Sequence, residues 1–330
     1  MKNNIGFLQL VKFLIFILLI YYLYTTVPWR EVNDVIFSAS VDMLILAIIM
    51  QIASVLIISA RWWMLLRKGA EVKLQSALKI GYIGTMFNNF MPSSIGGDFV
   101  RAYYISKIGV SLNKAINSLI VDRVMGLFFL LIFSFVFLII YRNITYIPSY
   151  IENTVILSLF GLFVLILIAK SSKLIAVSNS ILIKSFLSAD NRQRVSSSII
   201  EFQKNIPKNV VFLIMFLMSF FLLLVETTVF WLIALSLDII YPFYVFVIAV
   251  PIITIIAALP ISFGGLIMRE AAGIVILEMM GVTVAEASLI VILFIPVLII
   301  SSIPGFYSVS YTHLRAHETP EHLVCRLLLE

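Results

Sequence analysis

Two short stretches of the chain carry the same residue types at the same spacing, and the set is suited to binding an anion. The pattern Pro-x-Ser-x-Gly-Gly-x-x-x-Arg occurs in MPSSIGGDFVR, residues 91–101, and again in LPISFGGLIMR, residues 259–269. Proline ends one helix, serine caps the next, and paired glycines allow a sharp turn and the close approach of a ligand. The following helix aims its free N–H groups at that turn, where phosphate binds well. The arginine lies one turn further on the same face and can hold phosphate with two parallel hydrogen bonds.

We therefore predict a site for an anionic head group that draws on both copies. The first copy contributes Ser94, Gly96, Gly97, Asp98 and Arg101, after the turn at Pro92. The second copy contributes Ser262, Gly264, Gly265, Arg269 and Glu270, after the turn at Pro260. The alternative is that the glycines only let helices pack closely, while the arginines extend toward the membrane surface. Two copies with arginine at the same place favour binding.

The likeness between the two regions extends beyond the motif. GVSLNKA, which begins at Gly109, resembles GVTVAEA, which begins at Gly281, and SLIV follows each of them, at Ser118 and Ser288. Only 14 glycines and 10 prolines occur among 330 residues, so composition alone does not produce this match. The sequence predicts an internal repeat, with its motif regions at 88–123 and 257–291.

Several other polar residues lie within apolar sequence or at its edge. We expect Asn88 and Asn89 to line a cavity or to bond across a helical hairpin. Asp122 and Arg123 stand before an apolar run, where they either take part in the site or form a local ion pair at the membrane surface. Arg61, beside two tryptophans, is interpreted as an interfacial anchor.

Glu226 lies in the middle of an apolar run, LLLVETTVFW. An acid at membrane depth is costly and is by default a candidate for function. It could pair with a motif arginine or with Arg123, or carry a coupling proton. The alternative is a buried acid held by Thr227 or Thr228.

The elements that must position these residues are membrane helices. The chain is 62% hydrophobic and 12% charged, whereas soluble domains carry about 25% charged residues. We predict an all-α polytopic integral membrane protein with about six full spans. The expected spans are 5–27, 43–66, 124–141, 153–170, 209–237 and 287–304. Two further apolar segments, 76–95 and 243–265, run directly into the repeated motif.

The distribution of lysine and arginine predicts the orientation. Basic residues gather before the first span, in 67–79 and in 171–208, which places the N-terminus and those loops in the cytoplasm. Residues 98–120 must then also be cytoplasmic, so the segment 76–95 enters and returns as a re-entrant hairpin. By the same count 243–265 enters from outside and returns there. The two copies are therefore expected to be inverted, as in many transporters.

The last residues, 309–330, are expected to be foreign to the protein. VSYTHLRAHET, residues 309–319, is what a transposase-type sequencing-library adapter encodes, and LVCRLLLE, residues 323–330, matches its distal part. This tail holds every histidine and the one cysteine, so its zinc-like spacing is not interpreted as a metal site. We predict no metal and no cofactor, and a single membrane domain over residues 1–308.

NNFMPSSIGGDFVRAYYIS, VDRVMG, ALPISFGGLIMREA and RWWMLL resemble the transmembrane region of lysylphosphatidylglycerol synthases, within a broad group of flippase-like membrane proteins of bacteria and archaea. The resemblance covers residues 1–308. It implies movement of a phospholipid or a polyprenyl-linked lipid between leaflets. The synthase domain of the fused relatives does not occur in this sequence, so aminoacyl transfer is not implied. At matching positions the resemblance supports the two motif sets, together with Asp122 and Arg123.

The sequence thus predicts a flippase of a prokaryotic plasma membrane rather than an enzyme. The expected partners are an anionic or aminoacylated phospholipid such as lysyl-phosphatidylglycerol, or a polyprenyl-linked lipid, with a homo-oligomer or a separate lipid-modifying enzyme as further partners and no nucleic acid. The first alternative is a small-solute or ion-coupled secondary transporter, which an essential Glu226 would favour. The second is a non-transporting membrane partner of a lipid-modifying enzyme.

Overall fold

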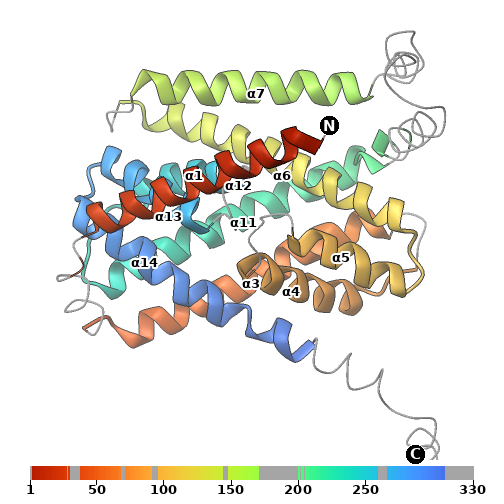
Figure 1. Ribbon diagram of the computed structural model, residues 1–330, viewed down its shortest axis with the longest axis horizontal. Coiled ribbons are helices and arrows are strands. Elements are labelled where there is room, and N and C mark those ends of the chain that lie inside the picture. Colours follow the sequence, from red (N-terminus) through yellow and green to blue (C-terminus); the bar gives the residue numbers. More distant parts are fainter. Residues whose placement is uncertain are drawn as a thin grey trace, which may run out of the picture.

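A computed structural model describes residues 2–27, 29, 38–67, 71–90, 96–143, 148–170, 200, 202–203, 205–258 and 266–308. These residues form helices and no strands. The long helices are α1 (Lys2–Thr26), α3 (Val41–Leu66), α4 (Leu74–Phe90), α5 (Gly96–Lys107), α6 (Leu112–Tyr141), α7 (Ser149–Lys170), α11 (Asn209–Ser236), α12 (Phe243–Ala258), α13 (Leu266–Met279) and α14 (Val284–Ser301). Most of them run close to the long axis of the molecule (Figure 1).

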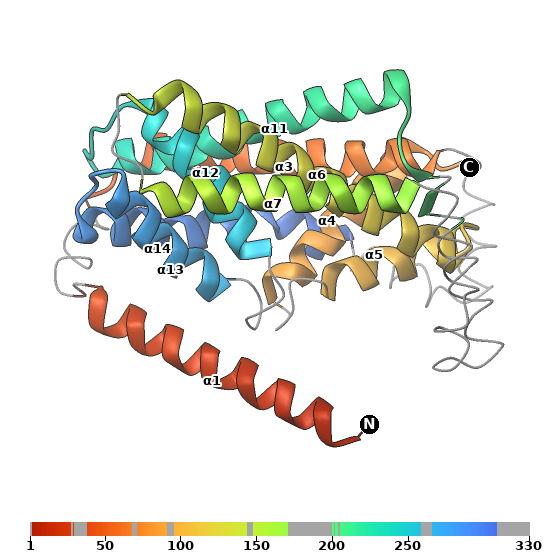
Figure 2. The ribbon, with the colours of Figure 1, turned by 90° about the horizontal axis from the view of Figure 1, so that it is seen from above.

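Five helical stretches are long and apolar enough to cross a membrane, which confirms the predicted multi-pass class. They are Val41–Leu66, Leu112–Tyr141, Ser149–Leu167, Val210–Ser236 and Val284–Ser308. The remaining expected span, 5–27, corresponds to α1, which has 25 residues. Helix α1 touches the rest of the protein through α13 and otherwise lies apart from the bundle (Figure 2).

One boundary differs from the prediction. Helix α6 begins at Leu112, well before the expected start at 124. The expected start at 124 made Asp122 and Arg123 the residues that precede the span, either as part of the site or as a local ion pair at the membrane surface. In the structure both side chains have partners inside the bundle, so the helix continues past them.

The helices form two sets of four with the same packing. In the first set α3 packs on α4, α4 on α5, α5 on α6, and α6 returns to α3. In the second set α11, α12, α13 and α14 repeat each of these contacts in the same order. The contacts between sets are paired as well, since α14 touches α3 and α4, while α6 touches α11 and α12. This packing matches the internal repeat in the sequence; the inversion of its second half across the membrane stays a prediction.

Both repeats contain a helical hairpin followed by a glycine turn. Gly109 after α5 and Gly281 after α13 have φ angles of 96° and 89°, a conformation that favours glycine. Ser111 and Thr283 then stand at the N-caps of α6 and α14 in extended conformation. The two sequences GVSLNKA and GVTVAEA therefore form the same turn.

The helices of each hairpin are short, and the ends of each hairpin lie together. At 1.5 Å per residue, α4 is about 25 Å long and α5 about 18 Å, less than the ~30 Å of a bilayer core. Before α12, the Tyr241 hydroxyl donates to Glu286 at 2.9 Å and lies 3.4 Å from the Gly281 carbonyl beyond α13. In the first hairpin, Val72 before α4 and Val110 after α5 share one apolar cluster. These lengths are compatible with the predicted re-entrant hairpins, and re-entry stays a prediction.

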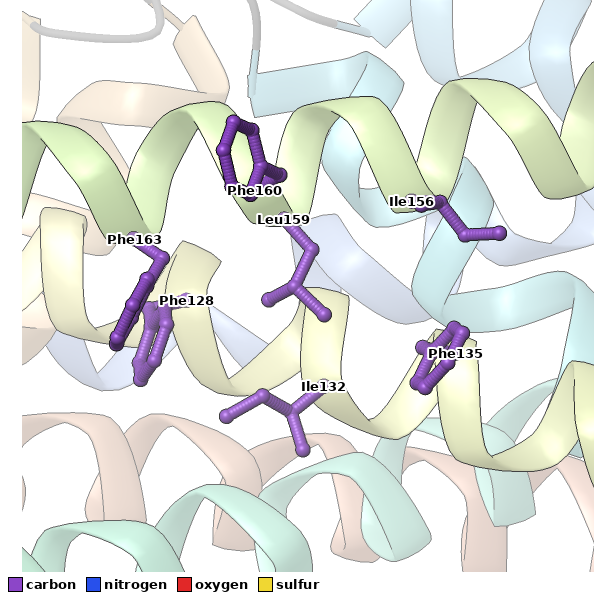
Figure 3. A pocket seen from close by; sticks show the side chains of 7 residues that line it. All are labelled: Phe128, Ile132, Phe135, Ile156, Leu159, Phe160 and Phe163. Carbon is purple, nitrogen blue, oxygen red and sulfur yellow. The ribbon is translucent and has the colours of Figure 1, made fainter.

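The apolar core holds the two repeats against each other. Its largest fully buried side chains include Phe129, Phe246 and Phe294, and Phe230 stacks on Phe294 at 4.6 Å between ring centroids. Helix α7 packs on the outer face of α6 and leaves an apolar pocket between them (Figure 3). Its lining residues are Phe128, Ile132, Phe135, Ile156, Leu159, Phe160 and Phe163. The lining of this pocket has no polar side chain.

Candidate functional site

A polar cavity of about 340 Å³ lies between the two repeats. Its charged lining residues are Arg61, Asp98, Arg101, Asp122, Arg123, Glu226 and Arg269. Its uncharged polar lining residues are Gln51, Ser54, Thr85, Asn88, Asn89, Ser219 and Thr254. Four arginines against three acids give the lining an excess of one positive charge. The structure thus gathers in one place most of the polar residues that the sequence singled out.

The deepest ion pair joins α3 to α6. The Arg61 guanidinium donates from Nε to Asp122 Oδ1 at 2.8 Å and from Nη2 to Oδ2 at 3.1 Å. Arg61 Nη1 also donates to the Ser219 hydroxyl of α11 at 2.9 Å. The interpretation of Arg61 as an interfacial anchor is wrong, because its side chain is 8% exposed and fully engaged within the bundle. The residues around Arg61 in the sequence are mostly apolar and do not indicate that a distant helix supplies an acidic partner.

A second ion-pair group joins α5 to α6. Asp98 forms an ion pair with Arg123 through its Oδ2 and approaches Arg101 through its Oδ1 at 3.7 Å. Arg101 and Asp98 are nearly covered, whereas the Arg123 side chain is 36% exposed. Together with the Arg61 pair, three arginines surround two aspartates at this end of the cavity. The excess of one arginine over the aspartates leaves a net positive charge, which can attract an anion.

Arg101 is held under α4 by close packing. It donates from Nη2 to the Gly81 carbonyl at 3.3 Å and to the Thr85 hydroxyl at 3.2 Å. A Cβ on Gly84 would lie 2.3 Å from Arg101 Nε, so only glycine leaves room for the arginine here. Arg101 is 6% exposed, and its Nε has no hydrogen-bond partner. This N–H is itself buried against Gly84, although other parts of the Arg101 side chain line the cavity.

The two asparagines before the first motif connect the hairpin and the repeats. Asn88 Oδ1 accepts from the backbone N–H of Gly97 at 2.7 Å, which bonds α4 to the start of α5. Asn89 Nδ2 donates to the Leu298 carbonyl of α14 at 3.3 Å. The Gly97 N–H, which the sequence offered to an anion, is therefore engaged by Asn88. A Cβ on Gly97 would lie 2.0 Å from the Gly84 carbonyl, so the glycine is needed for this packing.

The second motif presents its arginine differently. Arg269 is half-buried and lies over the Phe294 ring, with 5.3 Å from Cζ to the ring centroid. In the described part of the chain Arg269 forms no ion pair within 4 Å. The next residue, Glu270, is 3% exposed, its Oε1 has no partner, and it does not line the cavity. Arg269 is therefore the arginine of the cavity whose charge is least committed to the protein.

Glu226 projects from α11 into the same cavity. Its Oε1 accepts a long hydrogen bond of 3.5 Å from Gln51 Nε2 of α3. The expected pairing with an arginine does not occur within 4 Å among the described residues. The hydroxyl of Thr228 bonds to the Leu224 carbonyl instead, and that of Thr227 has no partner.

Several predicted site residues lie outside the described residues. They are Ser94, Ser262, Gly264 and Gly265, together with Pro92 and Pro260. Gly96 begins α5 at the edge of this region. Sequence reasoning also missed polar lining residues, chiefly Gln51, Ser54 and Ser219. A single glutamine in the apolar run IIMQIAS was the signal that could have indicated Gln51.

The lining of the cavity mixes charged and hydrocarbon side chains. Besides the arginines and acids it includes Leu223, Phe230, Ile253 and Leu298, from α11, α12 and α14. The cavity therefore offers both charged and apolar surface. The apolar spans and this internal site define a multi-pass membrane protein with an arginine-lined cavity between two repeated units.

Comparison with known proteins gives the family. The chain belongs to the lysylphosphatidylglycerol synthase TM region family, whose sequence model matches residues 9–305. Over 151 residues it is also 29% identical to a UPF0104 membrane protein of Methanocaldococcus jannaschii. That alignment covers 44% of this chain and 45% of the relative, so the chain matches about half the length of the curated relative. The resemblance predicted from the motifs is confirmed.

Proposed function

We propose that this protein moves an anionic or aminoacylated phospholipid, or a polyprenyl-linked lipid, between the leaflets of a prokaryotic plasma membrane. The observation that carries the proposal is the cavity, whose lining combines an excess of arginine over acids with hydrocarbon side chains. A volume of about 340 Å³ suits a head group rather than a whole two-chain lipid. The acyl chains therefore stay in the bilayer while the head group crosses. The proposed role is transport rather than catalysis.

Within this proposal the two motif arginines contribute differently to the binding of the head group. Arg101 is buried under α4, donates to the Gly81 carbonyl and shares Asp98 with Arg123, so it contributes mainly positive charge to the cavity. Arg269 has no carboxylate within 4 Å among the described residues and rests on an aromatic ring. Because a phosphate would give Arg269 its first close anionic partner, Arg269 contributes most to binding. The charge distribution of the loops supports a cytoplasmic N-terminus.

The test is transbilayer movement of labelled lipids in liposomes that contain the full chain. Phosphatidylglycerol and its lysyl ester are compared with phosphatidylcholine, which reports unspecific scrambling. Arg269→Gln should reduce movement at least tenfold, since it removes a charge-assisted contact with the head group. The matched control is Arg142→Gln, an exposed arginine paired to Glu152 at 3.6 Å outside the cavity. If folded wild type moves none of the lipids, the proposal is wrong and a small-solute transporter or a non-transporting partner takes its place.

A further inference from the structure

A second polar group occupies the cavity apart from the arginine–aspartate pairs. It consists of Glu226 on α11 with Gln51 and Ser54 on α3. Gln51 Nε2 donates one hydrogen bond to the Ser54 hydroxyl, at 3.1 Å, and another to Glu226 Oε1, at 3.5 Å. A buried carboxylate normally requires two or more good hydrogen bonds or an ion pair. Glu226 is half-buried and accepts one long hydrogen bond, with the Ser54 hydroxyl and the Arg269 charge as its other favourable neighbours. Among the described residues, neither a short hydrogen bond nor an ion pair within 4 Å holds its charged form.

The same group carries an unused acceptor. Gln51 is 4% exposed, and its Oε1 has no hydrogen-bond partner. A carboxylate cannot use an acceptor, whereas a protonated carboxylic acid has an O–H to donate. Gln51 therefore offers a donor to the ionised form of Glu226 and an acceptor to its neutral form. This arrangement serves a group that exists in both protonation states.

The other charged residues that line the cavity come from four helices. Arg61 on α3 and Asp122 on α6 neutralise each other, while Arg123 on α6 and Arg101 on α5 share Asp98 of α5. Helix α12 has no titratable side chain beyond Tyr244 near its start, and the acid of α14, Glu286, bonds to Tyr241 and Thr283 at the far end of that helix. Arg269 on α13 forms no ion pair within 4 Å among the described residues; it attracts the Glu226 carboxylate and lines the same cavity.

We infer that Glu226 is a proton-binding site coupled to the anionic ligand: a head group that binds Arg269 withdraws its positive charge from Glu226, which then takes up a proton. This inference rests on the proposed function. The proton comes from water in the cavity, forms an O–H bond on the carboxylate, and returns to water when the anion leaves. No electrons are exchanged. A head group with one negative charge then crosses together with one proton, as a neutral pair.

The coupling between binding of the anion and protonation of Glu226 is reciprocal, and this determines how the affinity changes with pH. If the anion promotes protonation of Glu226, protonation must tighten the binding of the anion by the same factor. Affinity is therefore highest at low pH and falls as the pH rises through the range in which Glu226 loses its proton. One proton for each anion sets the steepest slope at about tenfold per pH unit. A pH difference across the membrane would drive the lipid toward the less acidic side.

The experiment measures binding of short-chain phosphatidylglycerol to the purified full chain in uncharged detergent between about pH 5 and pH 9, a range in which the phosphodiester keeps its charge while a perturbed carboxyl titrates. Wild type is compared with Glu226→Gln, which resembles the protonated acid, and with Glu278→Gln, a matched change of an exposed acid on α13. We expect affinity to fall up to about tenfold per pH unit in wild type and Glu278→Gln. Glu226→Gln should bind with the low-pH affinity of wild type at every pH.

A direct measurement covers the case in which Glu226→Gln does not fold. A pH indicator in weakly buffered solution reports protons taken up as wild type binds the lipid, and we expect uptake approaching one per lipid near neutral pH. A pH-independent affinity with no proton uptake overturns the coupling while leaving the proposed lipid function standing. A pH slope that persists in Glu226→Gln also overturns it, because another group then carries the proton. The absence of binding at any pH contradicts the proposed function itself.

Discussion

Arg61 and Asp122, which are 61 positions apart in sequence, form a two-bonded ion pair with side chains only 8% and 7% exposed. The pair ties α3 to α6 beside the cavity, and its third hydrogen bond reaches Ser219 on α11. It therefore fixes three helices of the two repeats around the site. Its buried position makes it sensitive to the loss of either partner.

We predict that Asp122→Asn destabilises the protein by about 3–5 kcal/mol, because it leaves the Arg61 charge buried without compensation. The double change Arg61→Met with Asp122→Leu should recover most of that loss, since two apolar side chains of similar size need no partner. Thermal unfolding in detergent, followed by intrinsic fluorescence, measures both.

Glu152→Gln serves as the control for the buried pair. It breaks the pair with Arg142, whose side chain is 71% exposed, and should change the midpoint of unfolding very little. A double variant as unstable as Asp122→Asn alone would show that the pair contributes something other than charge compensation.

Gly97→Ala should loosen the α4–α5 hairpin. The added methyl group would lie 2.0 Å from the Gly84 carbonyl and 2.6 Å from the Asn88 amide, and a backbone carbonyl cannot move aside. Overpacking of this kind costs about 1–3 kcal/mol. Gly161→Ala is the matched control, because a Cβ there meets nothing within 4 Å and alanine favours the helix. Equal stability of the two variants in thermal unfolding would contradict the close contact.

The two turns that follow α5 and α13 provide a test of backbone conformation alone. A Cβ on Gly109 or on Gly281 meets no atom within 4 Å, but each glycine has a positive φ. Gly109→Ala and Gly281→Ala should therefore each destabilise by about 1–2 kcal/mol, through the cost of the left-handed conformation. Equal shifts in the unfolding midpoint support equivalent turns in the two repeats. A stabilising effect of either change would rule out the assigned conformation.

Labelling of single cysteines tests the predicted inversion of the repeats. With Cys325 replaced by serine, Lys107→Cys after α5 should react with an impermeant thiol reagent only from the cytoplasmic side. Ile240→Cys, an 82% exposed position before α12, should react only from the outer side. Intact cells and inverted membrane vesicles provide the two sides. Labelling of both positions from one side would mean that the second hairpin is not inverted relative to the first.

The helices and turns follow from local sequence. Long apolar runs must be helical in a membrane because each helix satisfies its own backbone hydrogen bonds. The glycines at 109 and 281 mark turns because other residues rarely adopt their conformation. For that reason the all-helical class and the repeated turns could be predicted, whereas the start of α6 could not. The charges at 122 and 123 end a helix only if nothing in the bundle pairs with them.

The two motif arginines have different surroundings, although the motif itself is repeated. The pattern placed Arg101 and Arg269 at equivalent positions, and both line the cavity. Their surroundings differ because Arg101 lies beside Thr85 and Asp98, while Arg269 lies over Phe294. Thr85 and Phe294 come from other helices, and Asp98, which is on the same helix as Arg101, is replaced by Leu266 in the second copy.

From the sequence alone came the class of protein, the internal repeat and most of the charged residues of the cavity, since these depend on composition and on short spacings along the chain. The tertiary structure decided which charged side chains pair with each other and which have no close partner of opposite charge. The partners of Arg61 and Glu226 lie 61 and 175 positions away. Contacts over such separations depend on how whole helices pack, because a rotation of one helix by a single residue would direct these side chains elsewhere.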